Sequence, residues 1–261
     1  MPLLGSNAGY IGSSQQPRAT NLPVVGKSNL GVVSSGLVLH LDAGNIASYP
    51  GTGTTWTDLS GSANHATLVN GVTWSGTLDG GVMICTATSN TVGQYIQTAG
   101  PNLSVTNHTV MGGVKIFNTS IAGRILNGRN NNWLLSNHNG GYSRCYFEGW
   151  LTDLSSGAGT NIPSQNVDTN WRIFSATGNY TSDSWAYYDG LTLNFGPNSY
   201  ASQGPNAFRI GCYADAVSEF SNCYISFVLA YNRVLSYAEI MQNYYVFKNR
   251  YAPLYTTYLP T

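Results

Sequence analysis

Short apolar runs separated by turn-forming residues recur through most of this chain, and they constrain its fold more than any other feature. The runs are rich in β-branched and aromatic residues, and glycine, asparagine, serine or proline lies between nearly all of them. That pattern is typical of the strands of an all-β sandwich. We predict strands over residues 37–42, 66–68, 82–85, 95–97, 109–117, 124–128, 133–136, 145–150, 171–177, 184–189, 191–195, 208–212 and 223–231.

The later part of the chain carries two more local signals. Asp189 and Gly190 stand between two apolar runs, and this dipeptide favours the two-residue turn of a β-hairpin. Ser236 followed by Glu239 is a capping box, which predicts a helix over residues 236–247. The rest of the sequence predicts strands and turns.

The chain carries few charges, which bears on its partners. Charged residues make up 8% of it, against about 25% in an ordinary soluble domain. We therefore expect its surface to be covered in an assembly, such as a homo-oligomer, with a trimer as one form. The 11 basic residues are scattered, so we expect no nucleic-acid partner. No apolar stretch approaches the roughly 18 residues of a membrane span, so we expect no membrane partner.

The first 34 residues differ from the rest in composition. They are mostly Gly, Ser, Asn, Pro and Gln, with neither a helical nor a strand period. We predict an extended docking arm over residues 1–34, one domain over 35–250 and an extended tail over 251–261; the alternative is an arm packed on its own domain. The apolar residues of the arm that we expect to dock on neighbouring proteins are Leu3, Leu4, Tyr10, Ile11, Leu22, Val24 and Val25.

The four cysteines follow no metal-binding or redox spacing. The first 31 residues lack the basic and apolar regions of a secretion signal, so we expect free thiols buried as small apolar groups. Whether Cys212 and Cys223 face each other across a hairpin stays open.

Motifs near the two ends of the predicted domain match a known family. Leu37–Asp42 is followed by Trp-Thr-Asp-Leu-Ser-Gly at 56–61, and Tyr-Asn-Arg-Val-Leu-Ser at 231–236 is followed by Glu239 and Ile240. With these motifs the chain resembles the concanavalin A-like lectin and glucanase domains, of the laminin-G-like type found in bacteriophage virion proteins. The resemblance implies a concanavalin A-like jelly-roll β-sandwich with one short C-terminal helix, preceded here by the extended arm.

Departures from the family pattern bear on calcium. The family often has an acidic cluster after a Gly-Gly strand, but here Gly80 and Gly81 lead into a stretch at 86–90 without a carboxylate. We therefore expect no cofactor, and leave calcium open at Asp42, Asp58 and Asp79. The alternative is that these aspartates accept hydrogen bonds from turn N–H groups. A further departure is Gly112-Gly113, where the family has Ala-Trp.

Because glucanases share this fold, hydrolysis has to be considered. It needs two carboxylates roughly 5–10 Å apart. The three glutamates, Glu148, Glu219 and Glu239, show no paired-carboxylate spacing. We predict that the chain is not an enzyme, with a glycoside hydrolase as the last alternative.

A binding site fits the sequence better than a catalytic one. Two neighbouring Asn-rich turns each carry an aromatic residue, a combination that suits sugar recognition through ring faces and amides. The alternative is that asparagine was selected there for left-handed turn conformations. The candidate glycan-binding residues are Asn130, Asn131, Asn132, Trp133, Asn137, His138, Asn139 and Tyr142.

The resemblance and the arm together lead to a functional hypothesis. We expect a phage virion structural protein, assembled in the host cytoplasm, that attaches to other virion proteins through its arm and displays a lectin-like domain. That domain either binds cell-surface carbohydrate or serves as capsid cement without a glycan. A tail fibre or receptor-binding protein is the next alternative. Capsid, neck and tail locations are equally open.

Overall fold

The computed structural model describes residues 31–105, 107–138, 142–147, 169–178, 185–188, 191–194 and 204–250, of which 137–138, 142–147, 185–188, 191–194 and 249–250 are described by their backbone alone. The chain divides after Leu30, and the fold belongs to the unit that begins at Gly31. This boundary lies four residues before the predicted start of the domain at residue 35. The N–H of Val33 donates to Asn243, and its side chain is buried, so these residues are part of the domain.

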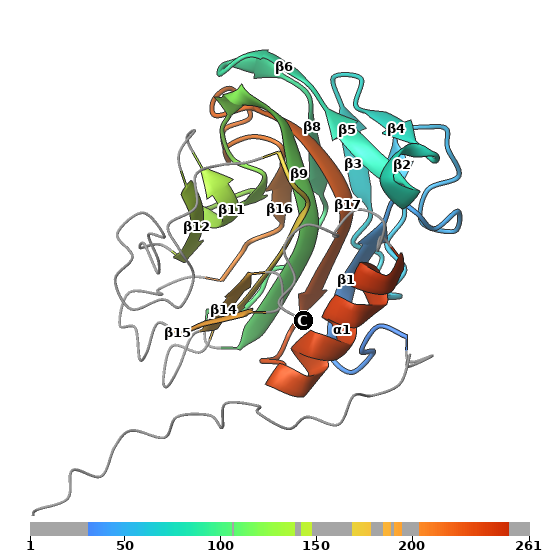
Figure 1. Cartoon of the computed structure of the whole chain (residues 1–261), viewed down its shortest axis with the longest axis vertical. Helices are drawn as coiled ribbons and strands as arrows, with labels where there is room; N and C mark the ends of the chain where they lie inside the picture. The colour runs from blue at the N-terminus through green and yellow to red at the C-terminus, as the bar shows by residue number, and fades with distance from the viewer. Residues whose placement is uncertain are drawn as a thin grey trace, which may run out of the picture. The chain divides into compact units, whose positions relative to one another are not determined.

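Two large antiparallel sheets make up the described fold (Figure 1). The first has eight strands, in the order β15 (Leu191–Asn194), β14 (Trp185–Tyr188), β13 (Arg172–Gly178), β9 (His108–Ala122), β17 (Ser221–Tyr231), β5 (Val82–Cys85) and β4 (Thr73–Ser75), with β1 (Leu37–Asp42) also paired to β17. The second has seven, in the order β12 (Tyr142–Phe147), β11 (Trp133–His138), β10 (Leu126–Gly128), β16 (Phe208–Ile210), β8 (Tyr95–Thr98), β3 (Ala66–Val69) and β2 (Thr55–Trp56). The remaining elements are η1 (Leu78–Gly80), the hairpin of β6 (Ala87–Ser89) and β7 (Val92–Gly93), and α1 (Tyr237–Arg250).

The main core lies between the two sheets. Trp56, Trp133 and Phe208 are fully buried in it, and the rings of Trp133 and Phe208 meet edge-to-face at 5.9 Å. Leu39 and Leu41 of β1 point into the same core, as their alternation predicts. The register of β1 shifts between Leu37 and Leu39, and Leu37 packs in a different cluster.

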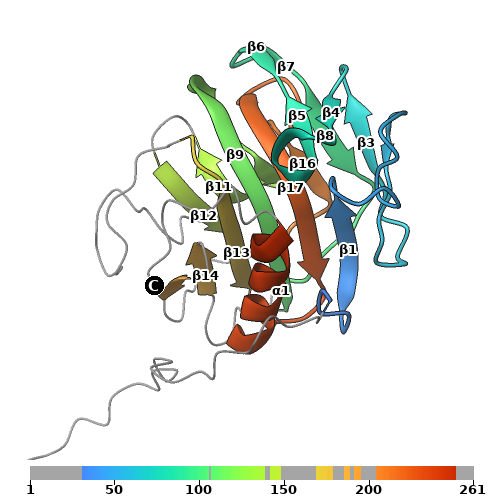
Figure 2. The same ribbon diagram turned by 45° about the vertical axis from the view of Figure 1, so that its right-hand side comes forward.

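A second apolar cluster lies between α1 and the outer face of the eight-stranded sheet, meaning the face turned away from the other sheet. Figure 2 shows α1 lying along β17 and β9 on this side. The ring of Phe227 stacks on Phe247 at 3.5 Å. Asn243 donates to the hydroxyl of Tyr231, which itself donates to the carbonyl of Val33. The helix therefore joins both ends of the domain.

The helix begins as the sequence predicts. Ser236 N–H donates to the Glu239 carboxylate at 2.9 Å, and Glu239 N–H donates to Ser236 Oγ at 3.4 Å, which is the reciprocal pair of a capping box. Arg233 clamps the same carboxylate with two N–H groups at 3.0 and 2.6 Å. Hydrogen bonding to Arg233 is the main cause that lowers the pKa of Glu239 to about 2.

The Gly112-Gly113 pair in β9 also has a packing reason. A Cβ at Gly112 would lie 2.5 Å from Leu126, and one at Gly113 would lie 2.6 Å from the ring of Phe227. Side chains from other strands therefore fill the space that a tryptophan would need. The aromatic residue that covers Gly113 of β9 is Phe227 of β17.

Within the described residues, the fold class predicted from the sequence is confirmed: the domain is an all-β jelly-roll sandwich with one C-terminal helix. Each predicted strand corresponds to an observed strand; the predictions at 37–42 and 82–85 match β1 and β5 in both ends, and the others differ in one or both ends. The predicted hairpin is confirmed by the pairing of Tyr188 with Leu191, while its turn residues lie outside the described part. Among the described residues, no helix combines the length and the apolar character that crossing a membrane requires.

His108 makes stability depend on pH. Its ring is fully buried beside Trp133, and its Nδ1 lies 2.6 Å from the Ser104 carbonyl oxygen. Burial lowers the pKa of His108 to about 4, from an ordinary value of 6.5. Between these values the unfolded chain binds more protons than the folded one, so stability falls as the pH falls from 6.5 to 4. The loss expected is about 3 kcal/mol.

Chemical denaturation at stepped pH measures this effect. The variant His108→Gln should flatten the slope of unfolding free energy between pH 6.5 and 4. The variant Glu239→Gln should leave that slope in place, because the lowered pKa of Glu239 acts in the lower window from its ordinary 4.5 to about 2. An unchanged slope in His108→Gln would show that other groups cause it.

Candidate functional site

The outer face of the seven-stranded sheet carries a row of polar side chains. Leu126, Phe208 and Ile96 point into the core, so the residues that alternate with them point outward. Asn127 of β10 lies opposite Arg209 of β16, which lies opposite Gln97 of β8. The guanidinium of Arg209 donates to Gln97 at 3.0 Å and lies 5.1 Å from the ring centre of Tyr95. The row therefore joins three strands that are far apart in sequence.

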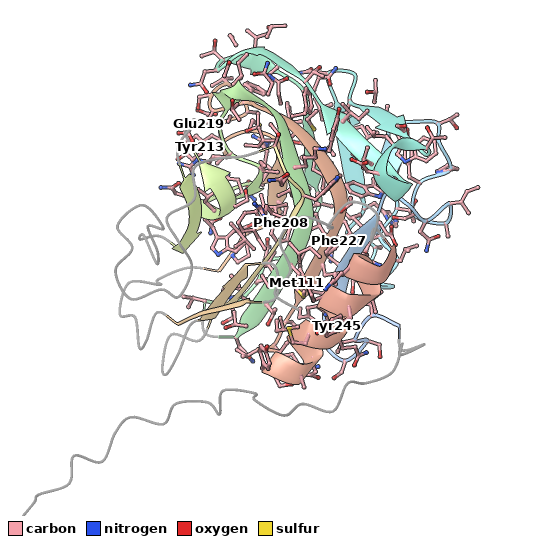
Figure 3. All side chains as sticks on the ribbon, viewed as in Figure 1. Met111, Phe208, Tyr213, Glu219, Phe227 and Tyr245 are labelled. Carbon is pink, nitrogen blue, oxygen red and sulfur yellow. The ribbon has the colours of Figure 1, made fainter. Side chains whose placement is uncertain are left out.

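Arg124 organises the region at one end of this row. Its Nε donates to the Glu219 carboxylate, and one terminal nitrogen donates to Asn127 at 3.0 Å and to Asn132 at 2.6 Å. The guanidinium carbon lies 4.3 Å from the ring centre of Tyr213, which is cation–π distance. We call these five residues the Arg124 cluster. Figure 3, viewed as in Figure 1, places Tyr213 and Glu219 next to each other, near β11.

The segment at 212–220 brings Tyr213 and Glu219 to the sheet. The C-terminal end of this segment is hydrogen-bonded to the backbone at 123–124. The N–H groups of Gly123 and Arg124 donate to the carbonyls of Phe220 and Glu219. A Cβ at Gly123 would lie 2.0 Å from the Glu219 carbonyl, so this approach requires glycine. Glu219 has a left-handed φ of 51°, which costs energy in a residue other than glycine.

Two groups of the Arg124 cluster have no hydrogen-bond partner within the described part of the chain. The second terminal nitrogen of Arg124, Nη2, is one of them, although the Arg124 side chain as a whole is only 9% exposed. The half-buried Tyr213 makes no side-chain hydrogen bond within the described part of the chain. The ion pair of Arg124 with Glu219 leaves the cluster close to neutral. An aromatic ring, an N–H pair without a partner among the described residues and near neutrality suit an uncharged hydroxylated ligand.

The structure corrects the prediction for one candidate residue. Trp133 is fully buried, with its ring packed against Phe208 and His108 in the core. No face of the ring is open to a sugar, so Trp133 is a core residue. β11 begins at Trp133, and the alternation of its side chains places Trp133 and Leu135 in the core.

The asparagines before Trp133 hold the turn together. Asn130 and Asn131 donate to Asn206 and Gly204 at 3.0 and 2.6 Å, and Asn132 belongs to the Arg124 cluster. None of these three has a left-handed φ, so the alternative that asparagine was selected for that conformation does not apply to them. Asn130 is exposed and lies beside the cluster in sequence.

Other predicted site residues lie wholly or partly outside the described part of the chain. Asn137 and His138 belong to β11, and Tyr142 to β12, where His138 pairs with Tyr142 through the backbone. Their side chains are outside the described part, as is Asn139 altogether. The same holds for the apolar residues of the arm, Leu3, Leu4, Tyr10, Ile11, Leu22, Val24 and Val25.

The three candidate calcium ligands each serve a local structure. Asp58 accepts the N–H groups of His40, Ser60 and Asn64, and Asp42 accepts that of Gly44. Asp79 accepts the indole N–H of Trp171 at 2.7 Å. Within the described residues, no three His, Cys, Asp or Glu side chains are placed to hold a metal ion.

Sequence reasoning missed most of the Arg124 cluster. Arg124 and Glu219 are 95 positions apart and join elements that only the folded sheet brings together. The sequence points to Glu219 only as a possible catalytic carboxylate, and no motif marks Tyr213 or Arg124 as site residues. The one available signal was Arg124 itself, an arginine placed among apolar residues at 121–126 in a chain with few charges.

Comparison with known proteins shows the fold. No protein-family model and no curated protein matches the chain. Among solved structures, domain 4 of the GH43 arabinanase AbnA from Geobacillus stearothermophilus, solved with arabinotriose, matches with a TM-score of 0.55 at 14% identity, over 80% of this chain and 98% of that one. A Trypanosoma rangeli sialidase matches at 0.57 and 17%, over 86% of this chain and 35% of its own. The receptor-binding domain of botulinum neurotoxin C/D mosaic matches at 0.54 and 17%, over 83% and 52%.

These neighbours correct one prediction. We predicted from the sequence that the chain is not an enzyme, and that prediction is contradicted, because glycoside hydrolases are among the solved structures that share its fold. In the described part, Glu219 is paired with Arg124 and Glu239 caps α1, while Glu148 lies outside it. The neighbours also include binding domains of toxins, so the fold occurs with both kinds of role.

Proposed function

We propose that this chain binds an uncharged oligosaccharide at the Arg124 cluster, on the outer face of its seven-stranded sheet. The observation that carries the proposal is the half-buried Tyr213 ring beside Arg124, whose Nη2 has no hydrogen-bond partner among the described residues. Tyrosine stacks on the C–H face of a sugar, while a guanidinium donates to its hydroxyl oxygens. Asn130, exposed at the adjacent turn, supplies an amide.

The near-neutral charge of the cluster favours an uncharged glycan over an acidic one. Glu219 already neutralises Arg124, so the cluster has no net positive charge to attract the carboxylate of a sialic acid. The Glu219 carboxylate would also repel that group. The arabinanase domain was solved with arabinotriose, an uncharged sugar, which makes arabinotriose a suitable first probe. Sialyllactose serves as the acidic comparison.

A paired substitution tests this site. Isothermal titration of the full chain with arabinotriose, and with hits from a glycan array, should show binding that Tyr213→Ala weakens at least about tenfold, as expected for loss of a stacking ring. Tyr245→Ala is the matched control, because Tyr245 is 46% exposed on α1, on the far side of the other sheet (Figure 3). Equal loss in both variants, or no loss in either, would place binding elsewhere.

We propose further that the chain works as part of a phage virion, with its N-terminal residues attaching it to other virion proteins. Support comes from the composition of residues 1–34 and from the motifs at 37–61 and 231–240 that resemble phage virion domains. Repeated copies would raise the avidity of weak glycan binding. A homo-oligomer, a location on capsid, neck or tail, and a tail fibre role all belong to this proposal.

Deletion of residues 1–30 tests the attachment. The shortened chain should keep its fold, measured by circular dichroism and thermal unfolding, because the folded unit begins at Gly31. Its incorporation into particles should be lost. Incorporation at the normal level would contradict attachment through this segment.

A further inference from the structure

Three cysteines lie buried near one another at the edge of the core. Cys85 of β5 and Cys223 of β17 are direct partners in neighbouring antiparallel strands, and both side chains belong to the core between the sheets. Cys212 follows Gly211, where a Cβ would lie 3.2 Å from the Cys85 sulfur. All three are free thiols in this structure.

We infer that Cys85 and Cys223 form a cross-strand disulfide when the chain folds in an oxidising medium, with a small-molecule disulfide such as oxidised glutathione as the oxidant. Opposed residues on one face of an antiparallel pair have Cα atoms about 4.5–5.5 Å apart, and disulfides bridge Cα atoms at about 4.4–6.8 Å. The Cα separation expected for this pair of residues therefore lies within the range that a disulfide bridges. The sequence had left open a pairing of Cys212 with Cys223, and the register favours Cys85 instead.

The chemistry takes two exchange steps. The Cys85 thiolate attacks one sulfur of oxidised glutathione and releases the first glutathione thiolate. The Cys223 thiolate then attacks the Cys85 sulfur of the mixed disulfide and releases the second. The two thiol protons pass to the two released glutathiones, so two electrons reduce one glutathione disulfide.

The timing of the reaction follows from burial. Both thiols are fully buried, and the hydrogen bond to Cys223, with burial, raises the pKa of Cys85. The thiolate needed for exchange is scarce in the folded state, so the bond forms during folding or when β5 opens. Only the three-residue strand β4 lies between β5 and the edge of the sheet. Whether the folded chain contains the disulfide therefore depends on the redox conditions during folding.

Refolding of the full chain in a glutathione redox buffer, followed by non-reducing peptide mapping, tests the inference. We expect a linked peptide pair containing Cys85 and Cys223 in the wild type and in Cys212→Ala, and its absence in Cys85→Ala. The melting temperature of the wild type should rise by about 5–15 °C over the reduced protein, and a phosphine reductant should abolish the rise.

Two results would overturn the inference. One is a wild-type chain that refolds completely in the oxidising buffer with all thiols free. The other is a linked peptide that joins Cys212 or Cys145 in place of this pair. Mapping of the wild type decides between these outcomes even if a cysteine variant fails to fold.

Discussion

Replacing Trp133 by alanine is expected to lower the free energy of unfolding by about 3–5 kcal/mol, the range for removing a large aromatic from a core. The indole is fully buried between the sheets, where it contacts Phe208 edge-to-face and lies beside His108. Its removal leaves a cavity, and the rings of Phe208 and His108 are fixed by their strands and cannot move to fill it. Urea denaturation, monitored by far-UV circular dichroism of the backbone, measures the loss of unfolding free energy.

This result separates a core role from a sugar-binding role for Trp133. Trp133→Phe should lose less, because it keeps a ring in the same place. Tyr245→Ala, at an exposed position, should change stability by less than about 0.5 kcal/mol. If Trp133→Ala kept the wild-type stability, the ring would not be part of the core.

Replacing Arg124 by methionine should lower the free energy of unfolding by about 2–4 kcal/mol and abolish binding at the cluster. Methionine keeps much of the packing volume, so the loss comes from the charge and the hydrogen bonds. The buried amide oxygen of Asn127 loses its donor, and the Glu219 carboxylate loses its cation. Because Glu219 is 24% exposed, solvent limits the penalty to the lower part of the range for buried ion pairs.

A double variant shows whether the ion pair is the cause. Arg124→Met with Glu219→Gln removes both charges, and it should be more stable than Arg124→Met alone, because no unpaired carboxylate remains. Arg124→Lys should fall between wild type and methionine, since lysine keeps the charge and loses the planar fork. Equal stability of the single and double variants would mean that Glu219 does not depend on Arg124.

The strands and the helix could be predicted because their signals are local. The capping box at Ser236 and Glu239, and the two-residue gap between β14 and β15, are read from a few neighbouring residues. The elements that were missed, β2, β4, β6 and β7, are two or three residues long and carry no period. The bulge after Leu37 likewise changed the face of one side chain without a sequence signal.

The candidate site could be predicted only in part, because its residues come together through the sheet. The turn at Asn130–Asn132 was found, and Asn132 does reach the Arg124 cluster. Its partners come from β10 and from the segment before β17, which become neighbours through the order of strands in the seven-stranded sheet and the bonds at 123–124. A single sequence does not contain that order. The aromatic residue next to the turn, Trp133, is fully buried, while the aromatic residue of the cluster, Tyr213, is half-buried and lies far away in sequence.

A crystal structure of the full chain with a bound oligosaccharide, arabinotriose or a hit from the glycan array, tests the central claim most directly. The account predicts a sugar ring against Tyr213, with one hydroxyl oxygen within hydrogen-bond distance of Arg124 Nη2 and the Arg124–Glu219 ion pair intact. Sugar density at the α1 side of the molecule, or anywhere that leaves both Tyr213 and Arg124 without contact, would contradict it.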